Sequence, residues 1–369
     1  MSPASRLLIV AVSGRALAQS AGRAGYRPVV LDLFADRDTT AASSTSRRIG
    51  LPGTLRIDPA RLLGAARTLA PGADLVYGSG FEGRPGLIQR LSRGRTLYGN
   101  TPAALADVRD PARFFPLLQR LGVPHPAVRL TPPARSAGWL VKRPGTAGGT
   151  GVLPAGAATA ARGDYYQRLE AGDSLSATFL ADGRRARVLG FNRQWTAPRP
   201  GRPYLYGGAV GGLTPRPRLR REIEDALDAL VAETGLVGLN GFDFILQAGT
   251  WLALELNPRP PATFELYDPD YPGGLFRWHL RACQGELPLR AAAPRAARAH
   301  AVVHAIAETD EASMKFPRWC RDLPTRGTHF APGDPVCTVH ATASDVAGAM
   351  ALLRRRLHAC GRALGRRAA

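Results

Sequence analysis

Two apolar runs flank a short Gly-containing loop in the second half of the chain. The runs are Phe242–Leu246 and Trp251–Leu256, and this pattern predicts a β-hairpin. Side chains alternate along a strand, so Asp243 points to one face of the first strand, and Glu255 and Asn257 share a face at the end of the second. We therefore expect three oxygen-bearing side chains to converge at one end of this hairpin.

The amino-terminal part of the chain alternates strand patterns with helical ones. The pattern predicts strands over 7–12, 28–33 and 75–77 and helices over 15–24 and 58–68. Asp58 is the expected cap of the second helix, and Thr101 is the expected cap of a later helix that closes the first domain. Strands that alternate with helices indicate a parallel sheet with right-handed crossovers.

The rest of the chain has the pattern of an α+β domain followed by a small closing domain. Strands are predicted over 139–144, 174–180, 188–194, 204–210, 299–306 and 335–339, and helices over 110–121, 220–234, 276–283 and 344–360. Ser344 is the expected cap of the last helix. The expected fold class is α/β and α+β, with domains over 1–105, 106–290 and 291–369. The middle domain divides into a small lobe, 106–180, with a Gly-rich loop and a large lobe, 181–290, with the hairpin.

The chain is strongly basic. It has 49 Lys and Arg against 29 Asp and Glu, a formal net charge of +20 at pH 7. Such an excess fits a nucleic-acid partner or a polyanionic small substrate. The arginines are scattered, and few aromatic residues lie between them, so we favour the small substrate and expect no nucleic-acid partner.

Cysteine spacing and hydropathy give three negative expectations. The four cysteines, Cys283, Cys320, Cys337 and Cys360, have no CxxC spacing, so they suggest neither a zinc site nor a disulfide framework. No apolar run approaches the length of a membrane span. The first apolar run, 7–12, leads into a polar turn instead of a cleavage site, so we expect a cytoplasmic protein without a membrane partner.

The polar residues of the predicted hairpin indicate a metal site. Asp243 and Glu255 would be costly to bury without a cation, and their oxygens, with that of Asn257, favour Mg²⁺ or Mn²⁺ over Zn²⁺. Arg259 follows closely, so an anion there would be held by two cations. The simpler alternative is an amphipathic hairpin with one polar edge.

A lysine followed by a Gly-rich stretch indicates a phosphate site. Lys142 ends a predicted strand, and Gly145, Thr146, Gly148 and Gly149 follow it. Backbone N–H groups of such a stretch can approach phosphates closely. The order differs from a P-loop, in which the lysine follows the glycines. The alternative is a flexible surface loop.

A second Gly-rich turn, 78–85, follows the predicted strand 75–77. Ligands of open α/β sheets bind at the carboxyl ends of such strands. Glu82 and Arg84 in this turn are candidates for orienting a substrate, and the alternative is that both charges face water.

The spacing Asp243, Glu255-x-Asn257 and Arg259 resembles the magnesium-nucleotide signature of the ATP-grasp superfamily. The resemblance implies an ATP-grasp fold with an amino-terminal parallel-sheet domain, the pre-ATP-grasp domain, and a small carboxyl-terminal domain. It implies that the first three residues hold Mg²⁺ (or Mn²⁺) on the phosphates of ATP. Arg259 would face the reacting phosphoryl group, and Lys142 would be the second catalytic cation.

The same resemblance assigns the adenine and ribose contacts. It places Gln167 near the adenine amino group, with the backbone of Leu169 or Glu170 nearby, although residue chemistry alone would put Gln167 on the surface. Asp173 or Ser174 would meet the ribose. One position departs from the family.

That departure lies at the start of the helix predicted over 110–121. Family members often have an Asp-Lys pair here, and Pro111 takes the place of the lysine. The phosphate-binding role of that lysine is therefore lost or taken by Arg109 or Arg113.

The function that the resemblance implies is ATP-dependent ligation of a small carboxylate to an amine or related nucleophile through an acylphosphate. The stretch 78–85 and the YGNTP segment are most similar to predicted carboligases related to biotin carboxylase, including relatives associated with methanofuran and tetrahydromethanopterin one-carbon cofactors. A homodimer is compatible with this resemblance. The alternatives are a basic nucleic-acid-binding protein and an ATP-grasp protein that binds nucleotide without catalysis.

Overall fold

The amino-terminal part folds around a parallel sheet of five strands. The computed structural model describes residues 6–51, 54–157 and 161–363. The strands lie in the order β3-β2-β1-β4-β5 and are β1 (Leu7–Val10), β2 (Val29–Asp32), β3 (Thr45–Arg48), β4 (Asp74–Tyr77) and β5 (Leu97–Tyr98). Each neighbouring pair is parallel, which confirms the predicted sheet.

Five helices connect or follow these strands. They are α1 (Arg15–Arg23), α2 (Arg37–Ala41), α3 (Pro59–Leu69), α4 (Pro85–Leu91) and α5 (Pro102–Arg109). The side chain of Asp58 accepts hydrogen bonds from the amides of Ala60 and Arg61 at the start of α3. Thr101 accepts one from Ala104 in α5. Both caps agree with the sequence prediction.

A small antiparallel sheet follows helix α6 (Pro111–Arg120). Its strands lie in the order β6-β9-β7-β8 and are β6 (Val128–Arg129), β7 (Trp139–Lys142), β8 (Val152–Pro154) and β9 (Tyr165–Arg168). The Gly-rich stretch lies between β7 and β8. These two strands are antiparallel, and Lys142 at the end of β7 pairs with Val152 at the start of β8. This stretch is therefore the turn of a hairpin that projects from the small sheet.

The largest sheet has eight strands and runs through two of the predicted domains. Its order is β14-β13-β10-β11-β12-β15-β19-β17. The strands are β10 (Asp173–Asp182), β11 (Ala186–Thr196), β12 (Tyr206–Leu213), β13 (Val237–Gln247), β14 (Thr250–Asn257), β15 (Ala297–His304), β17 (Cys320–Arg321) and β19 (Pro335–Ala343). Because β15 pairs with β12, the sheet is continuous across residue 290. The domain limits suggested by the sequence remain predictions.

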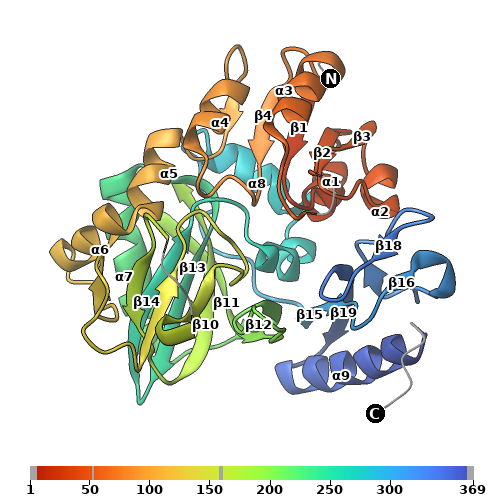
Figure 1. The fold of residues 1–369 in the computed structure, drawn as a ribbon. Coiled ribbons are helices and arrows are strands. Elements are labelled where there is room, and N and C mark those ends of the chain that lie inside the picture. Colours follow the sequence, from red (N-terminus) through yellow and green to blue (C-terminus); the bar gives the residue numbers. More distant parts are fainter. Residues whose placement is uncertain (1–5, 52–53, 158–160, 364–369) are drawn as a thin grey trace.

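Helices cover both faces of the large sheet, as Figure 1 shows. Helix α7 (Pro217–Thr234) buries Ile223, Leu227 and Leu230 in one core with Phe242 and Phe244 of β13. On the opposite face, α8 (Gly274–Ala282) packs against both β13 and α1. This second contact joins the amino-terminal domain to the large sheet.

The carboxyl-terminal segment ends in helix α9 (Val346–Ala363), which packs against β19 and β15. The Asp345 side chain accepts the amide of Gly348. The predicted cap Ser344 is therefore wrong by one residue. A short ladder of β16 (Thr309–Asp310) and β18 (His329–Phe330) lies nearby.

Four short 3-10 helices lie in connections of the described chain. They are η1 (Ala155–Ala157), η2 (Ala262–Leu266), η3 (Asp268–Asp270) and η4 (Glu311–Ser313). The segment around Thr263, directly after the hairpin of β13 and β14, is thus a short 3-10 helix. Among the described residues, no helix combines the length and the apolar character needed to cross a bilayer.

Candidate functional site

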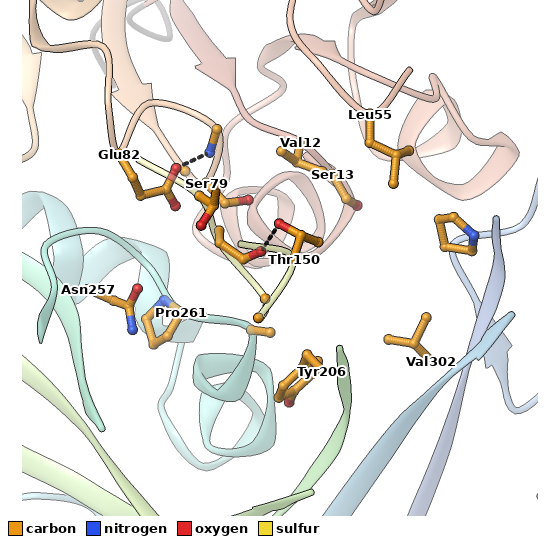
Figure 2. Close-up of a pocket in the computed structure, with 18 of the residues that line it drawn as sticks. Val12, Ser13, Leu55, Ser79, Glu82, Thr150, Tyr206, Asn257, Pro261 and Val302 are labelled. Carbon is orange, nitrogen blue, oxygen red and sulfur yellow. Dashed lines mark hydrogen bonds between the residues drawn. The ribbon is translucent and has the colours of Figure 1, made fainter. Parts of the chain in front are cut away.

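A cleft of about 1750 Å³ opens where the amino-terminal sheet, the two lobes and the carboxyl-terminal strands meet. Figure 2 shows Asn257 and Pro261 on one side of it, Ser79 and Glu82 above them, and Tyr206 and Val302 on another side. The Gly-rich stretch between β7 and β8 reaches the same cleft at Thr150.

A β-bulge in β14 turns the predicted metal ligands toward this cleft. Asp243 pairs with Glu255, but Phe244 pairs with Ala253, so Leu254 is an extra residue. Trp251 and Ala253 face the core, and strict alternation would send Glu255 there too. The bulge reverses the alternation, because Leu256 takes the core position instead.

Asp243, Glu255 and Asn257 consequently line the cleft together. The Asn257 amide donates to Asp243 Oδ2 at 2.9 Å, and the Gln194 amide donates to Asp243 Oδ1 at 2.8 Å. The three side chains that the sequence predicted as metal ligands are therefore within contact of one another. Gln194, on β11, was not predicted because an isolated glutamine in a strand carries no signal of this kind.

The two carboxyl groups differ in their electrostatic surroundings. Burial, and then the charge of Glu255, raise the pKa of Asp243 well above its ordinary value. Burial alone would also raise the pKa of Glu255, but Arg109, Lys142 and Arg259 outweigh burial and lower it. The pair thus has the crowded negative charge that a divalent cation would relieve.

Arg109 supplies a cation next to Glu255. It is the last residue of α5, and its guanidinium donates to Glu255 Oε2 at 3.3 Å and to the Thr146 carbonyl oxygen at 3.0 Å. Arg113 instead pairs with Asp107 on the exposed face of the helices. Of the two arginines that the sequence left open as substitutes for the lysine absent at Pro111, Arg109 is the one that reaches the site.

Arg259 lies between the metal ligands and the amino-terminal domain. Its Nε donates to Glu82 Oε1 at 2.7 Å, and its Nη2 donates to Asn257 Oδ1 at 3.3 Å. Glu82 is thus an orienting partner of Arg259. Arg84 is turned away to the Ile57 carbonyl oxygen at 2.9 Å, although it still borders the cleft.

Lys142 and Gln167 contact each other and do not border the cleft. The Lys142 ammonium donates to Gln167 Oε1 at 3.1 Å, and the Gln167 amide reaches the Leu254 carbonyl oxygen at 3.5 Å. Gln167 is only 1% exposed, so the surface position that residue chemistry suggested is wrong. Burial alone would lower the pKa of Lys142, but Tyr165 and Glu255 outweigh it and raise that pKa, so the ammonium stays charged.

The Gly-rich stretch is folded over the cleft. The amide of Tyr206 donates to the Gly148 carbonyl oxygen at 2.9 Å. Gly149 has φ +74°, and a Cβ there would lie 1.8 Å from the Tyr204 carbonyl oxygen. A Cβ on Gly145 would lie 2.6 Å from Gly83 Cα in the amino-terminal domain. The stretch can therefore adopt this closed position only with glycine at both 145 and 149.

The residues assigned to adenine and ribose lie partly at the cleft and partly away from it. The Leu169 amide donates to the Gly138 carbonyl oxygen, so only its carbonyl remains for a ligand. Glu170 accepts a hydrogen bond from Gln247 at 3.4 Å, close to the turn of the metal hairpin. Asp173 and Ser174 border the cleft, whereas Leu169 and Glu170 do not.

The donor set fits a divalent cation and a triphosphate. Two carboxylates and an amide oxygen are the hard ligands that Mg²⁺ takes. Among the described residues, Arg109 Nε is buried without a hydrogen-bond partner, so it retains a donor for an anion. Asp243, Glu255 and Asn257 would hold the cation, and Arg109, Lys142 and the glycine amides would face the phosphates.

A second cluster lies in the part of the cleft beyond Arg259. The Tyr206 hydroxyl is 2.7 Å from His300 Nε2, and burial lowers the pKa of His300 to about 4. Arg15, at the start of α1, pairs with Glu265 and with Asp322 at 2.9 Å. Sequence analysis gave no role to Arg15, His300 or Asp322, because the five residues of this cluster come from five separate segments without shared spacing.

A family model described as an ATP-grasp domain matches residues 109–263. The matched range contains β7, the Gly-rich stretch and the metal hairpin. A search of curated protein sequences finds no match.

Solved structures resemble the chain over nearly its whole length. Biotin carboxylase from Campylobacter jejuni, in a β-γ-ATP complex, has a TM-score of 0.71 at 14% identity and covers 97% of this chain and 91% of its own. The biotin carboxylase domain of 2-oxoglutarate carboxylase from Hydrogenobacter thermophilus, with MgADP and bicarbonate, has a TM-score of 0.72 at 14% identity, covering 96% and 90%. Phosphoribosylamine–glycine ligase from Thermotoga maritima has a TM-score of 0.70 at 16% identity, covering 97% and 96%. Likeness at these identities shows a shared fold.

Proposed function

We propose that this chain, in which residues 109–263 form an ATP-grasp domain, is an ATP-dependent ligase that activates a carboxylate as an acylphosphate and joins it to an amine or a related nucleophile. The observation that carries the proposal is the bulge in β14, which brings Asp243, Glu255 and Asn257 to one face beside Arg109 and Arg259.

The main barrier to this reaction is electrostatic. A carboxylate that attacks the terminal phosphate of ATP brings one anion onto another, so the site must neutralise charge before it can orient the reactants. Bound Mg²⁺, or Mn²⁺, would shield the phosphate oxygens and orient them. Arg109 and Lys142 add fixed positive charge on one side, and Arg259, held by Glu82, adds it on the other.

The Gly-rich stretch supports the second half of the reaction. An acylphosphate is lost if water reaches it before the nucleophile does. The stretch 145–151 lies against Gly83 and Tyr204, so it closes the cleft from above. This closed position would keep water away from the intermediate.

The substrate class follows from the charges that remain in the cleft. Glu82, Glu265 and Asp322 are paired with Arg259 or Arg15. Five further cations border the cleft, namely Arg48, Arg56, Arg84, Arg193 and Arg202, against two further carboxylates, Asp173 and Asp334. We propose an acid that carries more than one negative charge, and one-carbon cofactor precursors belong in the first substrate screen because of the sequence resemblance.

The test is a screen for ADP release with pools of polyanionic acids and amines, in the presence of Mg²⁺ and ATP. An active pair is then repeated with ¹⁸O in the carboxylate. Transfer of ¹⁸O to inorganic phosphate is the expected result, because an acylphosphate passes that oxygen to phosphorus. ADP formation without transfer of label would contradict the proposed intermediate.

Two Glu→Gln variants, which remove the same charge at nearly constant shape, test the site itself. Glu255→Gln should lose ADP release by about 10²-fold or more, the scale for removing one group that stabilises a transition state. Glu224→Gln, on the exposed face of α7, is the matched control and should keep full activity. ATP binding without turnover on any pair would favour the non-catalytic alternative.

A further inference from the structure

Three cysteine sulfurs meet inside the carboxyl-terminal part of the molecule. Cys320 lies on β17, Cys337 on β19 and Cys360 on α9. Their sulfur atoms all lie within 4.8 Å of one another, and all three residues are buried. Sequence spacing suggested no metal site because 17 and 23 residues separate the three cysteines. Pairing of β17 with β19 and packing of α9 on β19 bring them together.

We propose that Cys320, Cys337 and Cys360 form a thiolate site for one soft metal ion, Cu⁺ or Zn²⁺. Thiolates select these ions over Mg²⁺, Ca²⁺ and Mn²⁺. The site is therefore chemically distinct from the oxygen ligands of the cleft, and it does not depend on the proposed ligase function.

The distances fit a metal ion better than a disulfide. Metal–sulfur bonds of about 2.3 Å in tetrahedral geometry place sulfurs about 3.8 Å apart, so each sulfur needs to move by no more than about 1 Å. A disulfide requires about 2.0 Å between two sulfurs and would leave the third thiol behind. With all three sulfurs within 4.8 Å of one another, a shift of this size lets each of them contact the same ion.

The surroundings can balance the charge of such a site. Three thiols that bind a divalent ion release three protons and leave one net negative charge, and with Cu⁺ they leave two. Arg321 donates to the Cys320 carbonyl oxygen at 2.8 Å. Arg356 lies over the Trp319 ring at 5.7 Å and donates to the His340 carbonyl oxygen. Two guanidinium groups thus contact Cys320 or its neighbour Trp319, and their positive charge offsets part of the charge of the thiolates.

A bound ion would stabilise one wall of the cleft. The ligands join α9 to the sheet. Thr338 of β19, next to Cys337 and therefore on the other face of the strand, borders the cleft, as does His300 of the neighbouring strand β15. Figure 1 shows α9 lying along β15 and β19. Occupancy is therefore expected to raise the thermal stability of the chain.

The number of protein ligands separates the two ions. Among the described residues, the cluster offers three sulfurs and no fourth His, Cys or carboxylate. Structural Zn²⁺ sites take four ligands. We therefore expect Cu⁺ to bind more tightly than Zn²⁺.

The experiment uses the full chain, purified without oxygen and stripped of metal, with saturating Mg²⁺ to occupy the oxygen ligands. Cu⁺ and Zn²⁺ are titrated separately, and bound metal is counted after desalting. One Cu⁺ per chain is expected, with X-ray absorption showing sulfur ligands only. Absence of stoichiometric Cu⁺ binding, or nitrogen and oxygen ligands at the bound Cu⁺, would overturn the proposal.

Single serine variants identify the ligands. Cys320→Ser, Cys337→Ser and Cys360→Ser should each weaken binding by more than about 100-fold, since loss of a direct ligand exceeds the loss of about 10–100-fold for outer partners. Cys283→Ser lies outside the cluster and should bind as the unaltered chain does. Equal binding by all four variants would also overturn the proposal. The absorption measurement needs no variant, so a variant that fails to fold does not weaken the test.

Discussion

Arg109 supplies a cation close to where the ATP-grasp resemblance leads us to expect a lysine, at Pro111. The guanidinium enters from the end of α5 instead of the start of α6, and it contacts both Glu255 and the Gly-rich stretch. A guanidinium offers several fixed donors, so one group can bind a carboxylate, a carbonyl oxygen and a phosphate. The missing lysine therefore does not argue against catalysis.

Removal of that guanidinium should slow phosphoryl transfer. We expect Arg109→Ala to lower kcat/KM for ATP by about 10²-fold, because it removes a cation aimed at the phosphates. Arg113→Ala, on the exposed face of α6, is the control and should change little. Steady-state ADP release measures both variants, and equal activities would contradict the role of Arg109.

The sequence predicted the cleft residues that share a strand or a loop, and missed those that do not. Asp243, Glu255, Asn257 and Arg259 lie within a short stretch, so their types and spacing were readable. The contacts of Gln194, Tyr206 and His300 depend on pairing among β11, β12 and β15, which no local pattern records. The thiol cluster was missed for the same reason.

At the scale of elements, the bulge in β14 is the feature that makes the site. Trp251, Ala253 and Leu256 all face the core. Ala253 and Leu256 are three positions apart instead of two, because the bulge adds one residue between them. Simple alternation groups Glu255 with Asn257 correctly, but it also groups them with Trp251. The sequence therefore predicted that Glu255 and Asn257 share a face, but it did not predict the bulge that turns that face away from the core.

Closure of the Gly-rich stretch can be tested with two neighbouring glycines. Both Gly148 and Gly149 have positive φ, but a Cβ on Gly148 lies 3.8 Å from its nearest neighbour, whereas one on Gly149 lies 1.8 Å from a carbonyl oxygen. Gly148→Ala should cost about 1–3 kcal/mol of backbone strain in the closed state. Gly149→Ala adds a clash to that strain and should prevent closure.

The experiment measures how much of the acylphosphate is hydrolysed and how much is converted to ligated product. With Gly149→Ala we expect more ADP formed per product than with Gly148→Ala, because water reaches the acylphosphate when the stretch stays open. The ratio of ADP to ligated product measures this directly. Equal ratios for the two variants would show that closure does not protect the intermediate.

Helix α8 should make the fold sensitive to acid. His279 Nδ1 accepts the amide of Leu239 in β13 at 2.9 Å, and burial lowers the pKa of His279 to about 4. The neutral ring is the folded form, so this contribution is fully present above the unfolded value near pH 6.5 and is lost as pH falls toward 4.

The expected slope can be isolated with an uncharged substitute. The free energy of unfolding should fall between pH 6.5 and 4, by up to about 3 kcal/mol from this residue at about 1.4 kcal/mol per pKa unit. In His279→Gln, that part of the slope should disappear. Urea titrations at several pH values test this, and an unchanged slope in the variant would contradict it.

At the scale of the whole molecule, a buried ion cluster joins three distant parts of the chain. Arg15 of α1 pairs with Glu265 after the metal hairpin and with Asp322 before β19. Ser13 and Thr338 also donate to Asp322. Arg15, Glu265 and Asp322 line the cleft, and the same three residues join the parts of the chain that form its walls.

Loss of the shared cation should destabilise the assembly of these parts. Arg15→Gln leaves two half-buried carboxylates without their buried partner, so we expect a loss of about 3 kcal/mol in the free energy of unfolding, the lower end of the range for breaking a buried pair. Arg218→Gln, which removes an exposed helix pair, should cause no measurable change. Urea unfolding compares the two, and similar midpoints would contradict a structural role for Arg15.

The most direct test of the nucleotide site is a crystal structure of the chain with Mn²⁺ and ADP, with the ion located by its anomalous scattering. The account predicts an anomalous peak bound by Asp243, Glu255 and Asn257, with the ADP phosphates beneath the stretch 145–151. An ion bound elsewhere, or ADP outside this cleft, would contradict the assignment of these residues.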